Sequence, residues 1–220
     1  PGGELNRWFV FAGRLCNLKK VVLVIHSLPS RYKFSIRVFN QVKEYLIRSF
    51  SHEILTVSKS CCSQLISQTN LGDNIRVIAN GINVTHHKNK SSTCPWIKKQ
   101  ITIGYVGHIT HRKGVHVLIE SLKNIKYPCE VVIMGSSDAD YLEKLKFITK
   151  PNKIAINYLG YREDAKDLIK YIDIIVLPSI QQESFGMVIL EAMQHRVPVI
   201  CSDCLLYTSD AADDSLRVDP

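Results

Sequence analysis

The residues with the clearest chemical potential lie near the end of the chain, where residues 177–193 read LPSIQQESFGMVILEAM. Ser184 is a favourable helix cap, and the apolar run after it predicts a helix that reaches Gln194. The first amides of this helix would point outward from the positive end of the helix dipole, where phosphate binds well. These amides belong to Phe185, Gly186 and Met187. The stretch therefore predicts a site for an anion.

Two glutamates frame this helix start. Glu183 lies in the loop before it, and Glu191 lies inside Met187–Met193, a run that is apolar on nearly every side. A carboxylate buried in such a run cannot stay unpaired without a large cost in free energy. Two hydroxyls of a sugar would satisfy Glu191, and so would a basic group such as Arg196. The spacing alone does not decide between these partners.

A histidine stands at a strand end in the first half of the chain. The residues VVLVIHSLPS place His26 directly after the predicted strand Val21–Ile25. Groups that contact ligands gather at the carboxyl ends of strands in α/β sheets. A single histidine there can equally be structural, so both interpretations stay open.

The elements that must position these residues form two series, in which short β-branched runs alternate with segments of helical periodicity. This alternation predicts an α/β fold with parallel, doubly wound sheets. The first series has strands at Val21–Ile25, Glu53–Val57 and Ile75–Ile78, helices at Phe34–Phe50 and Ser60–Thr69, the second entered through Ser58, and a closing turn at Asn80–Gly81. The second series has strands at Ile101–Val106, Glu130–Met134, Ile154–Leu159, Ile172–Leu177 and Val197–Cys201, with helices at Asp140–Ile148 and Glu163–Tyr171 besides the one that ends at Gln194.

The first helix of the second series has one apolar face, formed by Val115, Leu118, Ile119 and Leu122. Apolar runs on both sides of each helix predict a sheet that is covered on both faces. Residues 85–100 are polar and lack any period, so we expect a linker there. The predicted domains are residues 1–84 and 101–203.

Composition narrows the classes of partner and the compartment. The net charge of +8 comes from Lys and Arg spread along the chain, and this pattern is unlike the charge blocks of a nucleic-acid tail. Nucleoside diphosphates, membrane lipid phosphates and nucleic acid are all anionic, and the charge alone does not choose among them. Apolar runs have the length of buried strands and fall short of a membrane span. Seven irregularly spaced cysteines favour reduced thiols in a cytoplasmic protein.

Four further segments are set aside as evidence for a site. Asp138 and Asp140 have the spacing of a metal-binding D-x-D motif, but they enter a helix, and N-capping explains them better. The adjacent pairs His86–His87 and Cys61–Cys62 lack the second half of a metal site, so no metal is expected. Residues 204–220 resemble the conceptual translation of a transposase-type sequencing adapter, residue for residue over Cys204–Asp213. We therefore expect a non-native tail and a chain that is an incomplete piece of a longer protein.

The frame ESFG-x4-EAM, with seven residues between Glu183 and Glu191, resembles the E-x7-E element of family 4 glycosyltransferases, which have the GT-B fold. The resemblance implies two Rossmann-like domains, both incomplete here. It also implies that Glu183 faces the sugar of a donor and that the amides of Ser184, Phe185, Gly186 and Met187 hold the donor phosphates. Glu191 would bind the ribose hydroxyls.

A second stretch, GYVGHITHRKG at residues 104–114, resembles the strand and turn that precede a Lys-Gly in the same family. By this resemblance Lys113 would contact the donor pyrophosphate as a compact cation at a helix entrance. The family most often has Arg where His108 stands, so the second phosphate contact is weaker here unless Arg112 reaches inward. Solvent-exposed roles for Lys113, His108 and His111 are the alternative.

His26 resembles the family's histidine beside the reacting carbon, so the resemblance implies catalytic roles for His26 and Glu183. The implied reaction moves a sugar from a nucleoside diphosphate sugar to an acceptor hydroxyl with retention of configuration, without a metal or other cofactor. The implied acceptor is a saccharide or a lipid-linked chain in polysaccharide or glycolipid synthesis, with peripheral association at the inner face of the plasma membrane. An epimerase of the same fold and a non-catalytic nucleotide-sugar-binding module are the alternatives.

Overall fold

A computed structural model describes residues 10, 12–13, 15–26, 49–68, 75–82, 93–96, 100–148, 154–181 and 185–203. The chain divides into two compact units. The first comprises residues 1–80 with 183–185 and 206–220, and the second comprises residues 81–182 with 186–205. The predicted tail at 204–220 and most of the predicted helix Phe34–Phe50 lie outside the described residues.

The first unit contains a parallel sheet in the order β1-β2-β3. The strands are β1 (Val22–Ile25), β2 (Glu53–Thr56) and β3 (Ile75–Val77), and helix α3 (Lys59–Gln68) connects the last two. These bounds confirm the predicted strands and the second predicted helix to within one residue. Ser58 caps α3 as expected, because its Oγ accepts a hydrogen bond of 3.1 Å from the Cys61 amide. The core of this unit joins Leu23, Ile54 and Leu65.

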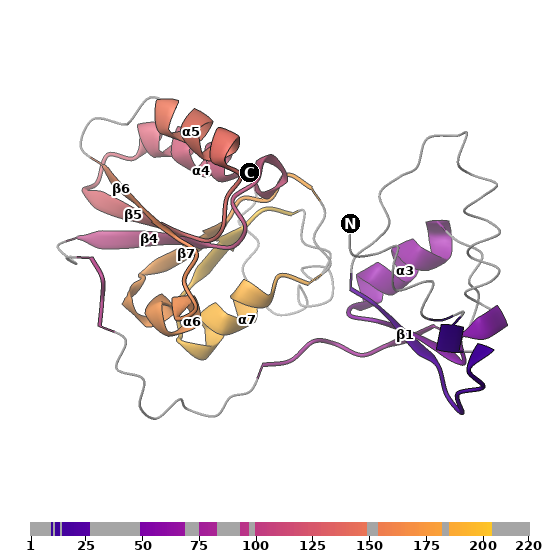
Figure 1. The fold of residues 1–220 in the computed structure, drawn as a ribbon. Helices are drawn as coiled ribbons and strands as arrows, with labels where there is room; N and C mark the ends of the chain where they lie inside the picture. The colour runs from indigo at the N-terminus through magenta and orange to yellow at the C-terminus, as the bar shows by residue number, and fades with distance from the viewer. Residues whose placement is uncertain are drawn as a thin grey trace. The chain divides into compact units, whose positions relative to one another are not determined.

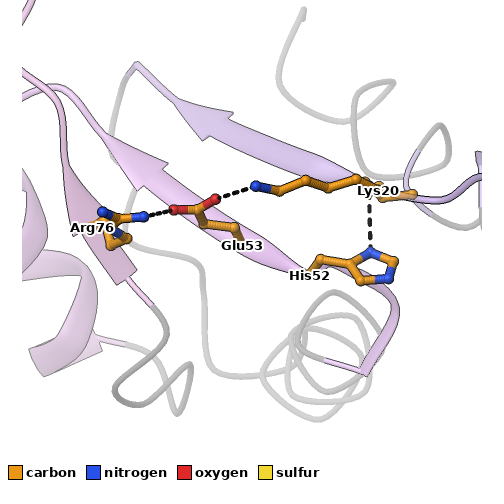
Figure 2. A network of polar contacts seen from close by, with 5 residues as sticks. Lys20, His52, Glu53 and Arg76 are labelled. Carbon is orange, nitrogen blue, oxygen red and sulfur yellow. Dashed lines mark hydrogen bonds and ion pairs between the residues drawn. The ribbon is translucent and has the colours of Figure 1, made fainter.

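Charged side chains cross the amino end of this sheet (Figure 2). Glu53 accepts from Arg76 on β3 at 2.7 Å and pairs with Lys20, just before β1, at 3.1 Å. The neighbouring His52 receives the Val21 amide on its Nδ1 at 3.1 Å and donates its own amide to the Val21 carbonyl at 2.9 Å. One carboxylate thus joins two cations over three adjacent strands.

The second unit is built on a five-stranded parallel sheet in the order β6-β5-β4-β7-β8 (Figure 1). The strands are β4 (Ile101–Val106), β5 (Cys129–Met134), β6 (Ala155–Gly160), β7 (Ile174–Leu177) and β8 (Val199–Cys201). The helical segments are η2 (His111–Lys113), α4 (Val115–Ser121), η3 (Leu122–Asn124), α5 (Ala139–Phe147), α6 (Ala165–Leu168), η4 (Ile169–Tyr171) and α7 (Met187–Gln194). The doubly wound sheet predicted from the sequence is confirmed.

Two apolar layers cover the faces of this sheet. Strand β5 alternates between them: Val131 and Ile133 pack with α4 and α5, whereas Val132 and Met134 pack with α6, η4 and α7. Figure 1 shows α4 and α5 on one face and α6 and α7 on the other. The predicted apolar face is buried at all four positions, three of them on α4 and the fourth, Leu122, on η3. Asp138 caps α5 by accepting from the Asp140 amide at 3.1 Å, which confirms the capping interpretation.

Four elements begin two or more residues later than predicted. Strand β8 begins at Val199 instead of Val197, because the Val197 amide bonds the Ala192 carbonyl at 2.9 Å, and helix α6 begins at Ala165 instead of Glu163, after its N-cap Asp164. Strand β7 begins at Ile174 instead of Ile172, because the Asp173 carboxylate binds the Thr102 amide at 2.8 Å and the Ile172 side chain fills the space beside Gly104. Helix α7 begins at Met187, so the predicted start at Ser184 or Phe185 is wrong. Within the predicted linker, Trp96 is buried in the core of the second unit and meets the Tyr171 ring edge-on.

Candidate functional site

The order of the strands creates a switch point between β4 and β7. The chain leaves β4 toward β5 on one side of the sheet and leaves β7 toward β8 on the other side. Open α/β sheets bind ligands beyond the carboxyl ends of the strands at such a point. The loop after β4 contains His108 and Lys113, and the segment after β7 leads to the start of α7. The predicted phosphate-binding residues of this unit therefore border the switch point.

Backbone hydrogen bonds hold the loop after β4 against its neighbour. The Gly107 amide donates to the Met134 carbonyl at 2.9 Å, and the Ile109 amide donates to the Ser136 carbonyl at 2.8 Å. Next to these bonds the exposed His108 ring places Nδ1 3.4 Å from Ser136 Oγ. The loops after β4 and β5 therefore run side by side, with the His108 ring at their junction.

Lys113 ends the 3-10 turn η2, directly before α4. Its amide donates to the Thr110 carbonyl at 3.0 Å, and its side chain is half-buried. Gly114 follows with φ 67°, and a Cβ there would lie 1.8 Å from the Pro178 carbonyl oxygen. Only glycine fits both the left-handed backbone and this close approach. A hydrogen bond of 3.0 Å from the Ile180 amide to the Arg112 carbonyl joins the same two segments.

Helix α7 starts at a left-handed glycine. Gly186 is the N-cap, with φ 69° and ψ 61°, so the predicted capping role of Ser184 is wrong. The physical reason is that Gly186 takes the left-handed conformation and interrupts any helix that would begin before it. The Ile189 amide bonds the Gly186 carbonyl at 2.9 Å, which leaves Met187 and Val188 as the first amides of the helix. Glu183 and Ser184 lie outside the described residues, and Phe185 is described but not helical.

Glu191 is buried on α7 and has a basic partner. Its Oε1 lies 3.4 Å from Lys166 Nζ on α6, with 11% of the Glu191 side chain exposed and 71% of the Lys166 side chain. The sequence left open a pairing with Arg196 or another basic group, and Lys166 is the basic partner. An ion pair with so exposed a cation contributes roughly 0.2–1 kcal/mol.

His26 belongs to the first unit, where it is exposed directly after β1. His108, Lys113, Gly186, Met187 and Glu191 belong to the second unit. The structure thus brings the phosphate-binding candidates of the second unit to one end of one sheet, and it leaves His26 as a separate prediction.

Sequence reasoning missed a cluster of rings beside Lys113. The His111 and His116 rings stack with centroids 4.6 Å apart, and His116 Nδ1 lies 2.8 Å from the Tyr141 hydroxyl. Burial lowers the pKa of His116, the nearby His111 lowers it further, and Glu120 acts against both. The signal in the sequence was a pair of histidines on either side of Lys113-Gly114.

Metal sites and membrane spans are both absent from the described part of the chain. Those residues contain no group of three or more His, Cys, Asp or Glu side chains that could hold a metal ion. They likewise contain no helix with the length and apolar character needed to cross a bilayer.

Solved structures share this fold. HepE of Anabaena, in complex with UDP and glucose, superposes with a TM-score of 0.74 at 21% identity, over 91% of this chain and 57% of HepE. The trehalose-6-phosphate structure of E. coli, bound with UDP-2-fluoro glucose, superposes with a TM-score of 0.69 at 11% identity, over 93% of this chain and 58% of its own. These similarities establish a GT-B fold.

Sequence relatives agree with the fold. An uncharacterized glycosyltransferase of Methanocaldococcus jannaschii is 35% identical over 72% of this chain and 44% of its own length. The capsular polysaccharide biosynthesis glycosyltransferase CapM of Staphylococcus aureus is 28% identical over 70% and 41%. The phosphatidyl-myo-inositol mannosyltransferase of Propionibacterium freudenreichii is 30% identical over 65% and 36%. The chain thus spans less than half the length of these relatives.

The family model described as "Glycosyl transferases group 1" matches residues 86–214, which include the loop after β4, the segment after β7 and helix α7. This match covers more than half of the chain and includes every candidate residue of the second unit. The chain belongs to the group 1 glycosyl transferases.

Proposed function

We propose that the protein transfers a sugar from a nucleoside diphosphate sugar to an acceptor hydroxyl with retention of configuration. The observation that carries this proposal is the position of Lys113 and the start of α7 on the two segments that border the switch point. A cation and a helix amino end on either side of such a crevice suit a diphosphate. The UDP and glucose bound by HepE support a donor of this class.

In this proposal Lys113 and the amides of Phe185, Gly186 and Met187 neutralise the charge that develops on the leaving diphosphate. Preorganised groups of this kind supply much of the rate in many enzymes. Ser184 and His108 add weaker phosphate contacts, and His26 and Glu183 orient the sugar. The residues in these roles act without a metal or other cofactor.

Glu191 would bind the ribose hydroxyls, which requires it to exchange its present partner. The Lys166 side chain is largely exposed, so giving up the ion pair costs little free energy. The two ribose hydroxyls would then donate hydrogen bonds to the buried Glu191 carboxylate. These bonds would also make the site specific for a nucleotide. The present ion pair is therefore compatible with a ribose site.

The proposed acceptor is a saccharide or a lipid-linked chain in polysaccharide or glycolipid synthesis. The names of CapM and of the phosphatidyl-myo-inositol mannosyltransferase support this class. The basic charge of the chain would favour peripheral association with anionic lipid at the cytoplasmic face of the membrane. Flotation of the complete protein with anionic and with neutral vesicles tests this, and equal behaviour with both would contradict it.

The activity test uses the complete protein, a panel of nucleoside diphosphate sugars, and NMR to read the anomeric configuration of the product. We expect Lys113→Met to lower kcat/KM for the donor about 100-fold, since it removes a charge that stabilises the leaving group. Lys123→Met, at an exposed position of η3, is the matched control and should change nothing. Glu191→Gln should raise the donor KM about tenfold.

The outcomes separate the alternatives. Turnover of donor without acceptor would indicate an epimerase. Absence of nucleotide binding would favour a degenerate, non-catalytic transferase that has lost its donor site, which His108 in place of the family's usual Arg supports. An unchanged donor KM in Glu191→Gln would leave the ion pair with Lys166 as the only role of that carboxylate, and inverted product would contradict retention.

A further inference from the structure

Three aromatic rings from different elements meet beside the Lys113 turn. The His111 ring, on η2, stacks on the His116 ring, on α4, with an interplanar angle of 19°. The Tyr141 ring, on α5, stands edge-on to both, with centroid distances of 6.2 Å and 6.3 Å. Its hydroxyl lies 2.8 Å from His116 Nδ1. The ring cluster, as we call His111, His116 and Tyr141, therefore links the turn to two helices.

Tyr141 joins the ring cluster to the core of the second unit. Tyr141 is partly buried against the core that contains Val115, Leu118 and Leu145. Burial raises the pKa of the Tyr141 phenol, which keeps the hydroxyl neutral and able to bond to the imidazole. A ring that contacts Tyr141 therefore contacts a residue that packs against the core of the unit.

The turn itself is short, and its described contacts point in two directions. Residues His111–Lys113 form a single 3-10 turn, and Gly114 after it is left-handed. Backbone contacts to Pro178 and Ile180 fix the turn toward the segment after β7. Those contacts run through Arg112 and Gly114, whereas His111 supplies the contact toward α5. Stacked and edge-on ring contacts favour particular mutual orientations, so these three rings bias the orientation of a turn as short as this one.

We propose that the His111–His116–Tyr141 ring cluster is a positioning device that holds the Lys113 turn in the orientation required to receive the donor diphosphate. The inference rests on the proposed function of Lys113. The proposal gives the three rings no contact with the reacting atoms. They act by removing alternative conformations of the turn before the donor binds, which lowers the entropy lost on binding.

The first measurement is hydrogen exchange at the amides of Lys113 and Gly114, which bond the carbonyls of Thr110 and His111 at 3.0 Å each. It needs neither donor nor activity. We expect His111→Ala to speed exchange at both amides about tenfold, because the turn opens more often. His111→Phe retains a flat ring for stacking and should keep exchange within about twofold of the original.

The second measurement is the donor KM and kcat of the complete protein. His111→Ala should raise the donor KM about 5–10-fold with a smaller change in kcat, His111→Phe should restore it, and Tyr141→Phe should have an intermediate effect. Tyr127→Phe, at a ring that is 79% exposed, is the matched control for loss of a hydroxyl. Thermal unfolding of each variant separates an effect on the turn from loss of the fold.

The combined results of the two measurements support or overturn the positioning role of the ring cluster. Faster exchange and a raised KM in His111→Ala, both reversed in His111→Phe, support the cluster as a positioning device. Unchanged exchange, or faster exchange with an unchanged donor KM, overturns it while the proposed function stands. Faster exchange in a protein that binds no nucleotide sugar at all overturns the proposed function and, with it, the positioning role.

Discussion

The two ends of the five-stranded sheet are held together by different kinds of bond. At the amino end, side chains join the strands: Gln100 Nε2 donates to the Cys129 carbonyl at 2.9 Å, Asp173 accepts the Thr102 amide, and Thr102 Oγ1 donates to Glu130 Oε1 at 2.9 Å. At the carboxyl end most of the bonds between loops run from backbone to backbone.

The difference shows how one sheet separates stability from ligand contact. The side-chain hydrogen bonds at the amino end require particular residue types, because a substitution that removes one of these bonds leaves a buried polar group unpaired. Backbone bonds at the carboxyl end fix most of the path of the loops with little demand on which side chains they carry, apart from the glycines and the ring cluster beside Lys113. In the proposed function, the donor would then orient the side chains of His108 and Lys113 without a change in the path of the loops.

The largest effect should come from the glycine that lets the two carboxyl-end segments touch. Gly114→Ala would place a Cβ 1.8 Å from the Pro178 carbonyl oxygen at φ 67°. We expect a loss of about 3–5 kcal/mol in the free energy of unfolding, from left-handed strain and overpacking together, and loss of donor binding. Denaturant unfolding measures the first and calorimetric titration the second.

Gly160 supplies the matched control. It has φ 66° but nothing within 4 Å of an added Cβ. Gly160→Ala should therefore show the left-handed strain alone, about 1–2 kcal/mol. Equal losses in the two variants would mean that the contact between the segments does not constrain the loop.

The strand pattern and the local caps were within reach of the sequence. Ser58 and Asp138 were predicted as caps because a hydroxyl or carboxylate just before a helical run bonds amides only two or three residues away. The same signal failed at Ser184, because Gly186 two residues later takes the left-handed backbone conformation and becomes the N-cap itself. The fold could thus be predicted wherever a single local preference governed a boundary.

The partners of the site residues were out of reach. Lys166 lies on a different helix from Glu191, and the ring cluster joins three elements that meet only after the sheet has formed. Spacing identifies which groups need partners, and packing decides which partner each receives. The E-x7-E frame could suggest Glu191 as a ligand-binding residue for this reason, but it could not name Lys166.

Two threonines test the contrast between the ends directly. Thr102→Val at the amino end removes the hydroxyl that bonds Glu130, and leaves a buried carboxyl group short of a partner. We expect the free energy of unfolding to fall by about 1–3 kcal/mol with an unchanged donor KM. Thr110→Val at the carboxyl end removes a buried hydroxyl with no hydrogen-bond partner among the described residues, so the free energy of unfolding should stay the same or rise. Equal losses would contradict the contrast.

The smallest effect should come from the amino end of the other sheet, where Glu53 joins Lys20 and Arg76 at the surface (Figure 2). Hydrogen bonds from Lys20 and Arg76 lower the pKa of Glu53 below its ordinary value of 4.5. Because the folded protein holds this proton less tightly than the unfolded chain, the stabilisation is present above pH 4.5 and is lost as the pH falls through the lowered value.

Glu53→Gln should therefore lower the midpoint of thermal unfolding slightly at neutral pH and leave it unchanged at a pH below the lowered pKa. Added salt should shrink the difference at neutral pH, because both cations are exposed and screening acts on them. A difference that persists at low pH and high salt would mean that Glu53 stabilises the strands by packing. Side chains at this amino end would then act through shape instead of charge, unlike the bonds of Thr102 and Glu130.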